Sequence, residues 1–257
     1  MRPTVFGIDI DPIDQKTLIG ELVKRARERR PCYVVPTNLH LVLRRRSDPK
    51  LRLALADPAA LVVPDGHPLV WMAWLRGIAM QLVNGSDLVV PLCRAAARNR
   101  LSVFLFGTTF GTLAECGRRL SSSIEGLRIA GIYSPPFGFE RDTHESELAV
   151  SVIEAAAPDI VFVALGVPKQ EIWAQKHVAK KLKTQAICVG ASLDFIAGTQ
   201  WRAPPLFRRI GFEWLWRALT EPRRLGLRYL TILCWLPFLV ASDLLAAALR
   251  RGARKYR

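Results

Sequence analysis

The chain has 257 residues, of which 50% are hydrophobic and 23% are charged. This composition excludes general disorder and suits one α/β domain, or one domain with a short appendage. The 37 Lys and Arg residues exceed the 22 Asp and Glu residues, which gives a net charge of +15, and residues 201–257 alone hold 12 basic and 3 acidic residues. We therefore expect residues 1–200 to carry nearly balanced charge and the basic C-terminal segment to meet a polyanionic surface.

The five cysteines are scattered along the chain, with no CxxC pair and no histidine at the spacing of a zinc site. An odd, dispersed set inside apolar segments indicates reduced cysteines in the core and exposure to the cytosol. The N-terminus has no apolar stretch typical of a signal peptide, so we expect no export. The five positions are Cys32, Cys93, Cys116, Cys188 and Cys234.

Short apolar runs alternate with helical patterns, which is typical of βαβ units and predicts a mostly parallel, Rossmann-like sheet with flanking helices. We expect strands at Tyr33–Pro36, Leu61–Val63, Val103–Phe106, Arg128–Ile132, Ile160–Leu165 and Ala186–Val189. Asp11 and Pro12 predict the N-cap and first residue of a helix that runs to about Arg30. We expect further helices at Leu51–Ala56, Pro68–Arg76, Leu88–Arg98, Thr112–Ser122, Glu145–Ala156, Gln170–Lys181 and Leu206–Leu219.

The segment Tyr229–Leu249 is apolar at 17 of its 21 positions and has basic residues on both flanks. Its length permits a transmembrane helix, which needs about 20 apolar residues. However, Asp243 would cost about 2.5–3.5 kcal/mol in mid-bilayer, and Pro237 is expected to break the helix. A helix pair docked on the domain is the alternative; we favour partial insertion at an anionic membrane surface. We therefore divide the chain into a core, residues 1–205, and a basic, apolar helical appendage, residues 206–257.

Polar side chains follow the first two expected strands, and ligands bind beyond the carboxyl ends of strands in sheets of this kind. Asp65, in Pro64-Asp65-Gly66, offers a carboxylate where a general base could act, but on sequence alone a helix cap is the more common role of such an aspartate. Thr37 and Asn38 could bind sugar hydroxyls or cap the next helix, and the sequence does not decide between these roles. His40 has no partner acid or metal spacing and is expected to be structural.

Three later loops carry residues suited to a phosphate or a sugar. Gly107–Gly111 is similar to a phosphate-cradling turn, but it lacks the third glycine of a dinucleotide site and the Lys-Ser/Thr of a P-loop. Lys169 and Gln170 fall in the first turn of a helix, where a cation is unfavourable unless it meets an anion, so a ligand contact is favoured. Gly190–Asp194 has small residues suited to close approach of a ligand.

Asp9 and Asp11 match the two-residue pattern by which many sugar transferases hold a divalent cation. Such a short match is common by chance. We assign Asp9 to a strand end and Asp11 to the helix cap, and expect no metal site.

In chain order, these loops and their neighbours resemble the WecG/TagA/CpsF family of bacterial glycosyltransferases. The similarity spans about Gly7 to Tyr229. The blocks that carry it are Thr37-Asn38, Asp48-Pro49 with Leu51-Arg52, Pro64-Asp65-Gly66, Gly85-Ser86-Asp87-Leu88, Pro135-Pro136-Phe137-Gly138-Phe139, Pro158-Asp159-Ile160, Gly166-Val167-Pro168-Lys169-Gln170-Glu171, Gly190-Ala191-Ser192-Leu193-Asp194-Phe195, Arg202-Ala203-Pro204, Glu213-Trp214-Leu215-Trp216-Arg217 and Glu221-Pro222-Arg223-Arg224. A basic residue often precedes the family's GxDL block, whereas Gln81-Leu82-Val83 stands here, so one contact to the sugar or diphosphate is expected to differ.

The resemblance implies an inverting, metal-independent transfer of a sugar from a UDP-sugar to a polyprenyl-diphosphate-linked saccharide in cell-surface polysaccharide synthesis, without a cofactor. N-acetylmannosamine or its uronic acid is the expected sugar, and glucose or another hexose is the alternative. The resemblance places the general base on Asp65 and polar substrate contacts on Thr37, Asn38 and Gln170. It also implies that the basic segment from Glu213 onward closes the site and touches the membrane.

The residues themselves agree with such a reaction. A diphosphate that leaves without a metal needs fixed positive charge, which Lys169 and the arginines of the tail could supply. Arg217 and Arg224 lie seven residues apart, so they would share a face if one helix continued through Glu221.

Two other classes of protein stay open. An oxidoreductase would use the same sheet, but the dinucleotide pattern is missing. A non-catalytic basic protein that binds membrane or nucleic acid would explain the charge but not the polar loops. We expect a UDP-sugar, a polyprenyl-diphosphate-linked acceptor and an anionic membrane surface as partners, no nucleic acid, and a homo-oligomer as a possible state. The expected location is cytoplasmic, peripherally on the inner face of the cell membrane.

Overall fold

Six parallel strands form one sheet at the centre of the computed structural model, which describes residues 2–178, 180–209 and 211–255 and omits the side chains of Arg209, Arg224 and residues 250–255. The strand order is β4-β3-β8-β7-β5-β6. The strands are β3 (Cys32–Thr37), β4 (Ala60–Pro64), β5 (Ser102–Gly107), β6 (Arg128–Tyr133), β7 (Ile160–Ala164) and β8 (Gln185–Cys188). Each expected strand is present to within one or two residues, so the predicted α/β class is confirmed.

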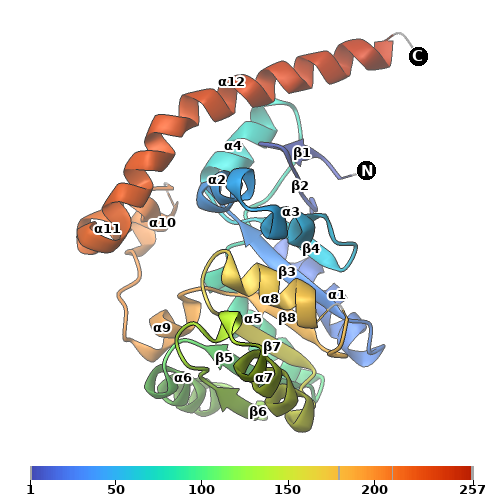
Figure 1. The fold of residues 1–257 in the computed structure, drawn as a ribbon, viewed down its shortest axis with the longest axis vertical. Coiled ribbons are helices and arrows are strands. Elements are labelled where there is room, and N and C mark those ends of the chain that lie inside the picture. Colours follow the sequence, from blue (N-terminus) through green and yellow to red (C-terminus); the bar gives the residue numbers. More distant parts are fainter. Residues whose placement is uncertain (1, 179, 210, 256–257) are drawn as a thin grey trace.

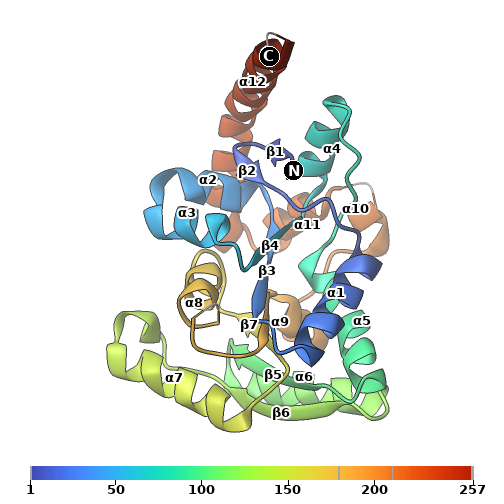
Figure 2. The same ribbon diagram turned by 90° about the vertical axis from the view of Figure 1, so that its right-hand side faces the viewer.

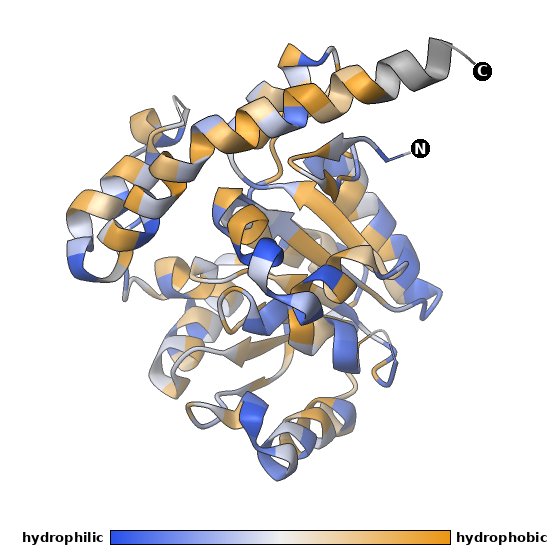
Figure 3. Ribbon diagram, turned by 45° about the horizontal axis from the view of Figure 1, so that its top comes forward, coloured by the Kyte–Doolittle hydropathy of each residue, from blue (hydrophilic) through white to orange (hydrophobic). Residues whose placement is uncertain are grey.

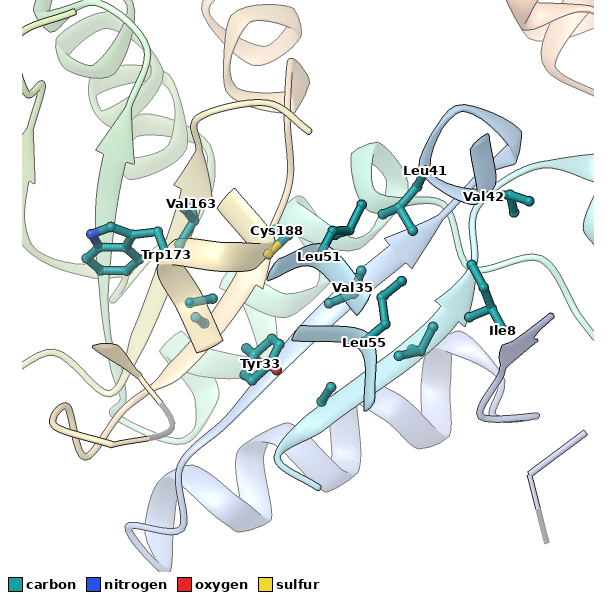
Figure 4. Packing of buried hydrophobic residues seen from close by; sticks show 14 of the residues in the cluster. Ile8, Tyr33, Val35, Leu41, Val42, Leu51, Leu55, Val163, Trp173 and Cys188 are labelled. Carbon is teal, nitrogen blue, oxygen red and sulfur yellow. The ribbon is translucent and has the colours of Figure 1, made fainter. Parts of the chain in front are cut away.

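Helices cover both faces of the sheet (Figure 2). Residues that alternate along each strand point to opposite faces, so Tyr33 and Val35 pack in one apolar cluster, while Val34 packs in the other. Figure 4 shows the first of these clusters, in which side chains from β3, α3 and α8 meet. The helices on that face are α2 (Leu39–Ser47), α3 (Pro49–Ala56), α7 (Thr143–Ala156) and α8 (Lys169–His177), and the short η1 (Phe139–Arg141) precedes α7. The opposite face carries α1 (Gln15–Arg27), α5 (Gly85–Arg98), α6 (Phe110–Ser123) and α9 (Ser192–Ala197).

The N-terminal residues form a small antiparallel pair, β1 (Thr4–Val5) and β2 (Ile8–Asp9), that the sequence patterns did not predict. The expected cap at Asp11 is wrong, because Asp14 is the N-cap of α1 and accepts a hydrogen bond from the Thr17 amide. Asp11 instead pairs with Arg2 at 2.7 Å and accepts a hydrogen bond from the Val62 amide. It therefore ties the N-terminal segment to β4.

The C-terminal appendage consists of α10 (Pro205–Arg209), α11 (Glu213–Thr220), the π-helical turn η2 (Pro222–Gly226) and α12 (Leu227–Lys255). The single helix expected at Leu206–Leu219 is therefore wrong, and so is the helix break expected at Pro237. Pro237 lies inside α12, which is held on both sides of the proline by the buried side chains of Ile232 and Leu239. The expected division at residue 205 falls at the start of α10 and stays a prediction.

Figure 1 shows α12 running across one end of the molecule, over α2, α4 (His67–Leu75) and the β1–β2 pair. Much of its ribbon is hydrophobic in Figure 3. The segment Leu227–Leu249 is long and apolar enough to cross a membrane, and only 22% of its most apolar part is buried within the protein. An apolar helix with this exposure is compatible with peripheral membrane association.

Candidate functional site

A cavity of about 750 Å³ lies at the carboxyl ends of the parallel strands, between the sheet, α2, α4 and the C-terminal appendage. Every strand end that the sequence singled out for a ligand contributes to its wall. The lining includes Asn38 after β3, Asp65 after β4, Thr108 after β5, Gly166 after β7 and Gly190 after β8. Residues of α11 and α12 in the appendage also line the cavity.

Asp65 is the cavity's carboxylate at the end of β4. Its amide donates a 2.7 Å hydrogen bond to the Thr37 carbonyl, which fixes the turn after the strand. Asp65 does not cap α4, whose N-cap position is Gly66 without a side-chain hydrogen bond. Burial raises the pKa of the Asp65 carboxyl from 3.8 to about 6, and the nearby Glu213 carboxylate contributes to the rise. A partly buried carboxylate with such a pKa is suited to accept a proton from a substrate hydroxyl near neutral pH.

Asn38 and Thr37 follow β3 but have different surroundings. The Asn38 side-chain oxygen caps α2 by accepting from the amides of His40 and Leu41, and its Nδ2 lies 3.5 Å from Asp65 Oδ2. Asn38 thus caps a helix and also faces the cavity, and its contact with a sugar stays a prediction. Thr37 is buried and its hydroxyl donates to the Val35 carbonyl, so the structure does not place it in the cavity wall.

The two candidate residues that follow β7, Lys169 and Gln170, have different surroundings. The side chain of Gln170 lines the cavity, accepts a hydrogen bond from the Gly190 amide at 3.1 Å and donates to Glu171 at 2.8 Å. Lys169 lies outside the cavity lining, where it pairs with Glu140 at 2.6 Å and stacks over Phe137. The geometry therefore supports Gln170 as a substrate contact more strongly than Lys169.

Arg217 of α11 lines the cavity. It stacks over the Phe195 ring, and its buried Nε has no hydrogen-bond acceptor among the described residues. Arg224 lies in η2, beyond the end of α11 at Thr220, so the single helix that would align the two arginines does not form. The side chain of Arg224 is outside the described part of the chain, and its role stays a prediction.

One side-chain hydrogen bond joins the loops after β5 and β8. The Thr108 hydroxyl donates to Asp194 at 3.0 Å, and both residues line the cavity. Thr109 caps α6 by accepting from the Thr112 amide. The turn at Gly107–Gly111 therefore contributes Thr108 to the site, with the N-terminus of α6 behind it.

The aspartate pair near the N-terminus lies away from this cavity. Asp9 accepts from the Thr4 hydroxyl, and Asp11 is paired with Arg2. Within residues 2–178, 180–209 and 211–255, no group of three or more His, Cys, Asp or Glu side chains could hold a metal ion.

Sequence reasoning missed several residues of the cavity. Glu213 was noted only as the start of the basic segment, although its charge acts on Asp65. Arg228 and Tyr229 also line the cavity, but in the sequence they are only the edge of an apolar run. The α2 helix, which follows Asn38, was not predicted. Its buried residues are confined to Leu39, Leu41 and Val42 near its start, which is too short a run to show a helical period.

Comparison with known proteins agrees with this geometry. The sequence matches the Glycosyl transferase WecG/TagA/CpsF family over residues 3–251. The chain belongs to this family. It is therefore a glycosyltransferase, and the predicted enzyme class is confirmed.

Two relatives share one name, N-acetylglucosaminyldiphosphoundecaprenol N-acetyl-beta-D-mannosaminyltransferase. The protein from Bacillus spizizenii is 33% identical over 200 residues, which is 77% of this chain and 74% of the relative. The protein from Staphylococcus aureus strain NCTC 8325 is 31% identical over 175 residues, which is 68% of this chain and 66% of the relative.

Proposed function

We propose that this glycosyltransferase moves N-acetylmannosamine, or its uronic acid, from a UDP-sugar to a polyprenyl-diphosphate-linked N-acetylglucosamine, forming a β-1,4 link with inversion. The observation that carries the proposal is the Asp65 carboxylate, held by the turn after β4 in a cavity that Arg217 of α11 and Arg228 of α12 also line. The names of both relatives support the sugar and the acceptor.

The reaction needs one base and one anion-stabilising group. Asp65 takes the proton from the acceptor hydroxyl while that oxygen attacks the anomeric carbon of the donor. The bond from this carbon to the β-phosphate oxygen breaks, and UDP leaves with the electron pair. Arg217 stabilises the leaving diphosphate, because its buried Nε has no acceptor among the described residues and a phosphate oxygen would supply one.

Asn38 and Gln170 orient the sugars in this proposal. Each has part of its amide committed within the protein, Asn38 to the α2 cap and Gln170 to Gly190 and Glu171. These contacts fix the rotamers and leave the remaining amide hydrogens for substrate hydroxyls. No cofactor and no metal take part.

The enzyme works in the cytoplasm on the inner face of the cell membrane in this proposal. Its lipid-linked acceptor is held in a bilayer, and the exposed apolar residues of α12 and its basic C-terminal end suit a peripheral contact with anionic lipid.

The test is an assay of the purified full chain with detergent-dispersed GlcNAc-diphosphoundecaprenol and a panel of UDP-sugars. Mass spectrometry and NMR of the product identify the sugar and the linkage. We expect transfer of N-acetylmannosamine or its uronic acid in a β link. Transfer of glucose or another hexose would change the donor, and no transfer from any UDP-sugar, with the acceptor recovered intact, would refute the proposal.

A further inference from the structure

The lining of the cavity changes in character along the first turns of α12. Arg228 and Tyr229 line it in the first turn, Ile232 and Leu233 lie one turn further, and Leu236 lies one turn beyond them. At a rise of about 1.5 Å per residue, the wall follows the helix for about 12 Å from Arg228 to Leu236. The wall therefore passes from a cation to aliphatic side chains as α12 runs away from α11.

Arginines of the cavity lie near both Asp65 and the first turn of α12. The charge of Arg217 acts both on Asp65 and on Tyr229 of α12. The Arg228 guanidinium stacks over the Tyr229 ring, and its charge also acts on His40 of α2. The arginines thus lie near the carboxylate, and the apolar wall begins one turn beyond Arg228 along α12.

We infer that the aliphatic end of the cavity, formed by Ile232, Leu233 and Leu236 of α12 with Leu39 of α2, binds the isoprenoid chain of the acceptor next to its diphosphate. This inference rests on the proposed function and adds a binding subsite to it. An acceptor of this class carries a sugar, a diphosphate and a hydrocarbon chain in that order, which matches the order of side chains along the cavity. A UDP-sugar has no hydrocarbon part that would use this wall.

The apolar wall is open to the outside of the molecule. The side chain of Leu233 lines the cavity and is still 46% exposed. Leu244 follows Leu233 by 11 residues, about three turns, so it lies on the same face of α12, and it is also exposed. A hydrocarbon chain that leaves the cavity past Leu233 therefore continues along an apolar helix surface instead of entering water.

A buried ion pair fixes the rotation of α12 about its axis. Asp243 accepts hydrogen bonds from Arg76 at 2.7 Å and from the Phe6 amide at 2.8 Å, and Arg76 also donates to the Thr4 carbonyl. Asp243 follows Ile232 by 11 residues, about three turns, so both lie on the same face of the helix. We assign Asp243 and Arg76 as positioning residues, because the contact with the β1–β2 pair decides which side chains of α12 face the cavity.

The test compares two leucines of one helical region that differ in their relation to the cavity. Leu233 lines it, whereas Leu230 is 58% exposed and does not. Leu233→Gln and Leu230→Gln are assayed in detergent micelles, so that binding to a bilayer plays no part. Each variant is given two acceptors, GlcNAc-diphosphoundecaprenol and a water-soluble GlcNAc diphosphate that carries a methyl group in place of the undecaprenyl chain. We expect Leu233→Gln to raise KM for the undecaprenyl acceptor about tenfold relative to KM for the methyl acceptor, because a polar amide replaces apolar contact area. Leu230→Gln should leave this ratio as in the wild type.

Equal ratios in the two leucine variants would overturn the inference. If the wild type uses the methyl acceptor as well as the undecaprenyl acceptor, the subsite is refuted while the proposed function stands. If it uses neither acceptor with any UDP-sugar, the proposed function fails, and the subsite with it.

Asp243→Asn tests the positioning role separately, since it keeps the shape of the side chain but removes the charge opposite Arg76. We expect this variant to raise KM for the undecaprenyl acceptor while kcat with the methyl acceptor stays within about twofold of the wild type. An equal loss of kcat with both acceptors would show that the ion pair supports the whole cavity and would contradict the positioning role at its apolar end.

Discussion

With Asp65 as the proposed general base, we expect the acid limb of the pH–rate profile to report the charge environment of its carboxyl group. Burial and the Glu213 carboxylate raise the pKa of Asp65 in the free protein from 3.8 to about 6. A base acts only when deprotonated, so kcat/KM should rise with pH through about 6 and level off above it. This rise in pKa corresponds to about 3 kcal/mol in favour of the protonated form. Burial is the larger cause and persists in Glu213→Gln. We therefore expect this variant to move the acid limb to lower pH by about 0.5–1 pH unit.

Arg217→Gln provides the matched control, since it alters the same helix with the opposite sign. The Arg217 charge lowers the pKa of Asp65, so its removal should move the acid limb to higher pH, in addition to lowering kcat. The measurement is kcat/KM between pH 4.5 and 8.5, at donor and acceptor concentrations well below their KM, with circular dichroism to verify folding at each pH. A limb that stays at the same pH in both variants, or that moves in the same direction in both, would refute the role of Asp65 as the titrating base.

Three further predictions concern the metal, the membrane and the appendage. Turnover should survive EDTA, because Asp9 and Asp11 are engaged by Thr4 and Arg2; loss of turnover that Mg²⁺ or Mn²⁺ restores would show a metal requirement. The protein should bind phosphatidylglycerol vesicles more tightly than phosphatidylcholine vesicles and be released by salt, because each basic residue near an anionic surface adds about 1 kcal/mol; equal binding to both in a sedimentation assay would contradict an electrostatic contact. Asp243→Ala should lower the free energy of unfolding by about 3–5 kcal/mol, because it removes the carboxylate that pairs with Arg76. Leu230→Ala, at an exposed position, should change this free energy by less than about 0.5 kcal/mol. Urea unfolding measures both, and equal values for the two variants would contradict the prediction.

The central sheet could be predicted from the sequence because its strands are buried on both faces. Runs such as Ile160–Ala164 are continuously apolar, and a polar or glycine-containing loop ends each one. The β1–β2 pair could not be predicted in this way, since its strands have two residues each. Its position depends on contacts with residues far along the chain, such as that between Phe6 and Asp243.

The continuity of α12 was missed for a related reason. A proline inside an apolar run predicts a break when only local propensity is considered. In the structure, α12 continues through Pro237 because buried residues on both sides of the proline and the ion pair of Asp243 stabilise it. A local sequence pattern shows neither of these contacts. The same ion pair explains why an acidic residue stands in an apolar segment.

The candidate site could be predicted as far as its strand ends. Asp65, Asn38 and Gln170 follow three different strands, and a parallel sheet brings the carboxyl ends of strands to one edge. The sequence could not show that Thr37 is buried or that Lys169 pairs with Glu140, because these outcomes depend on which way a side chain turns at a loop. The resemblance implied that the segment from Glu213 onward lies at the site, but the local patterns could not show which side chains of α11 and α12 line the cavity.

The central claim is that Asp65 is the general base of a sugar transfer in this cavity. The most direct test is kcat of Asp65→Asn with UDP-N-acetylmannosamine and GlcNAc-diphosphoundecaprenol, with donor binding measured by calorimetry on the same preparation. The account predicts that the variant folds and binds the donor with an unchanged Kd while kcat falls by about 10²–10⁴-fold, which is the contribution typical of a positioned base. A correctly folded Asp65→Asn enzyme that binds the donor and turns over at the wild-type rate would contradict it.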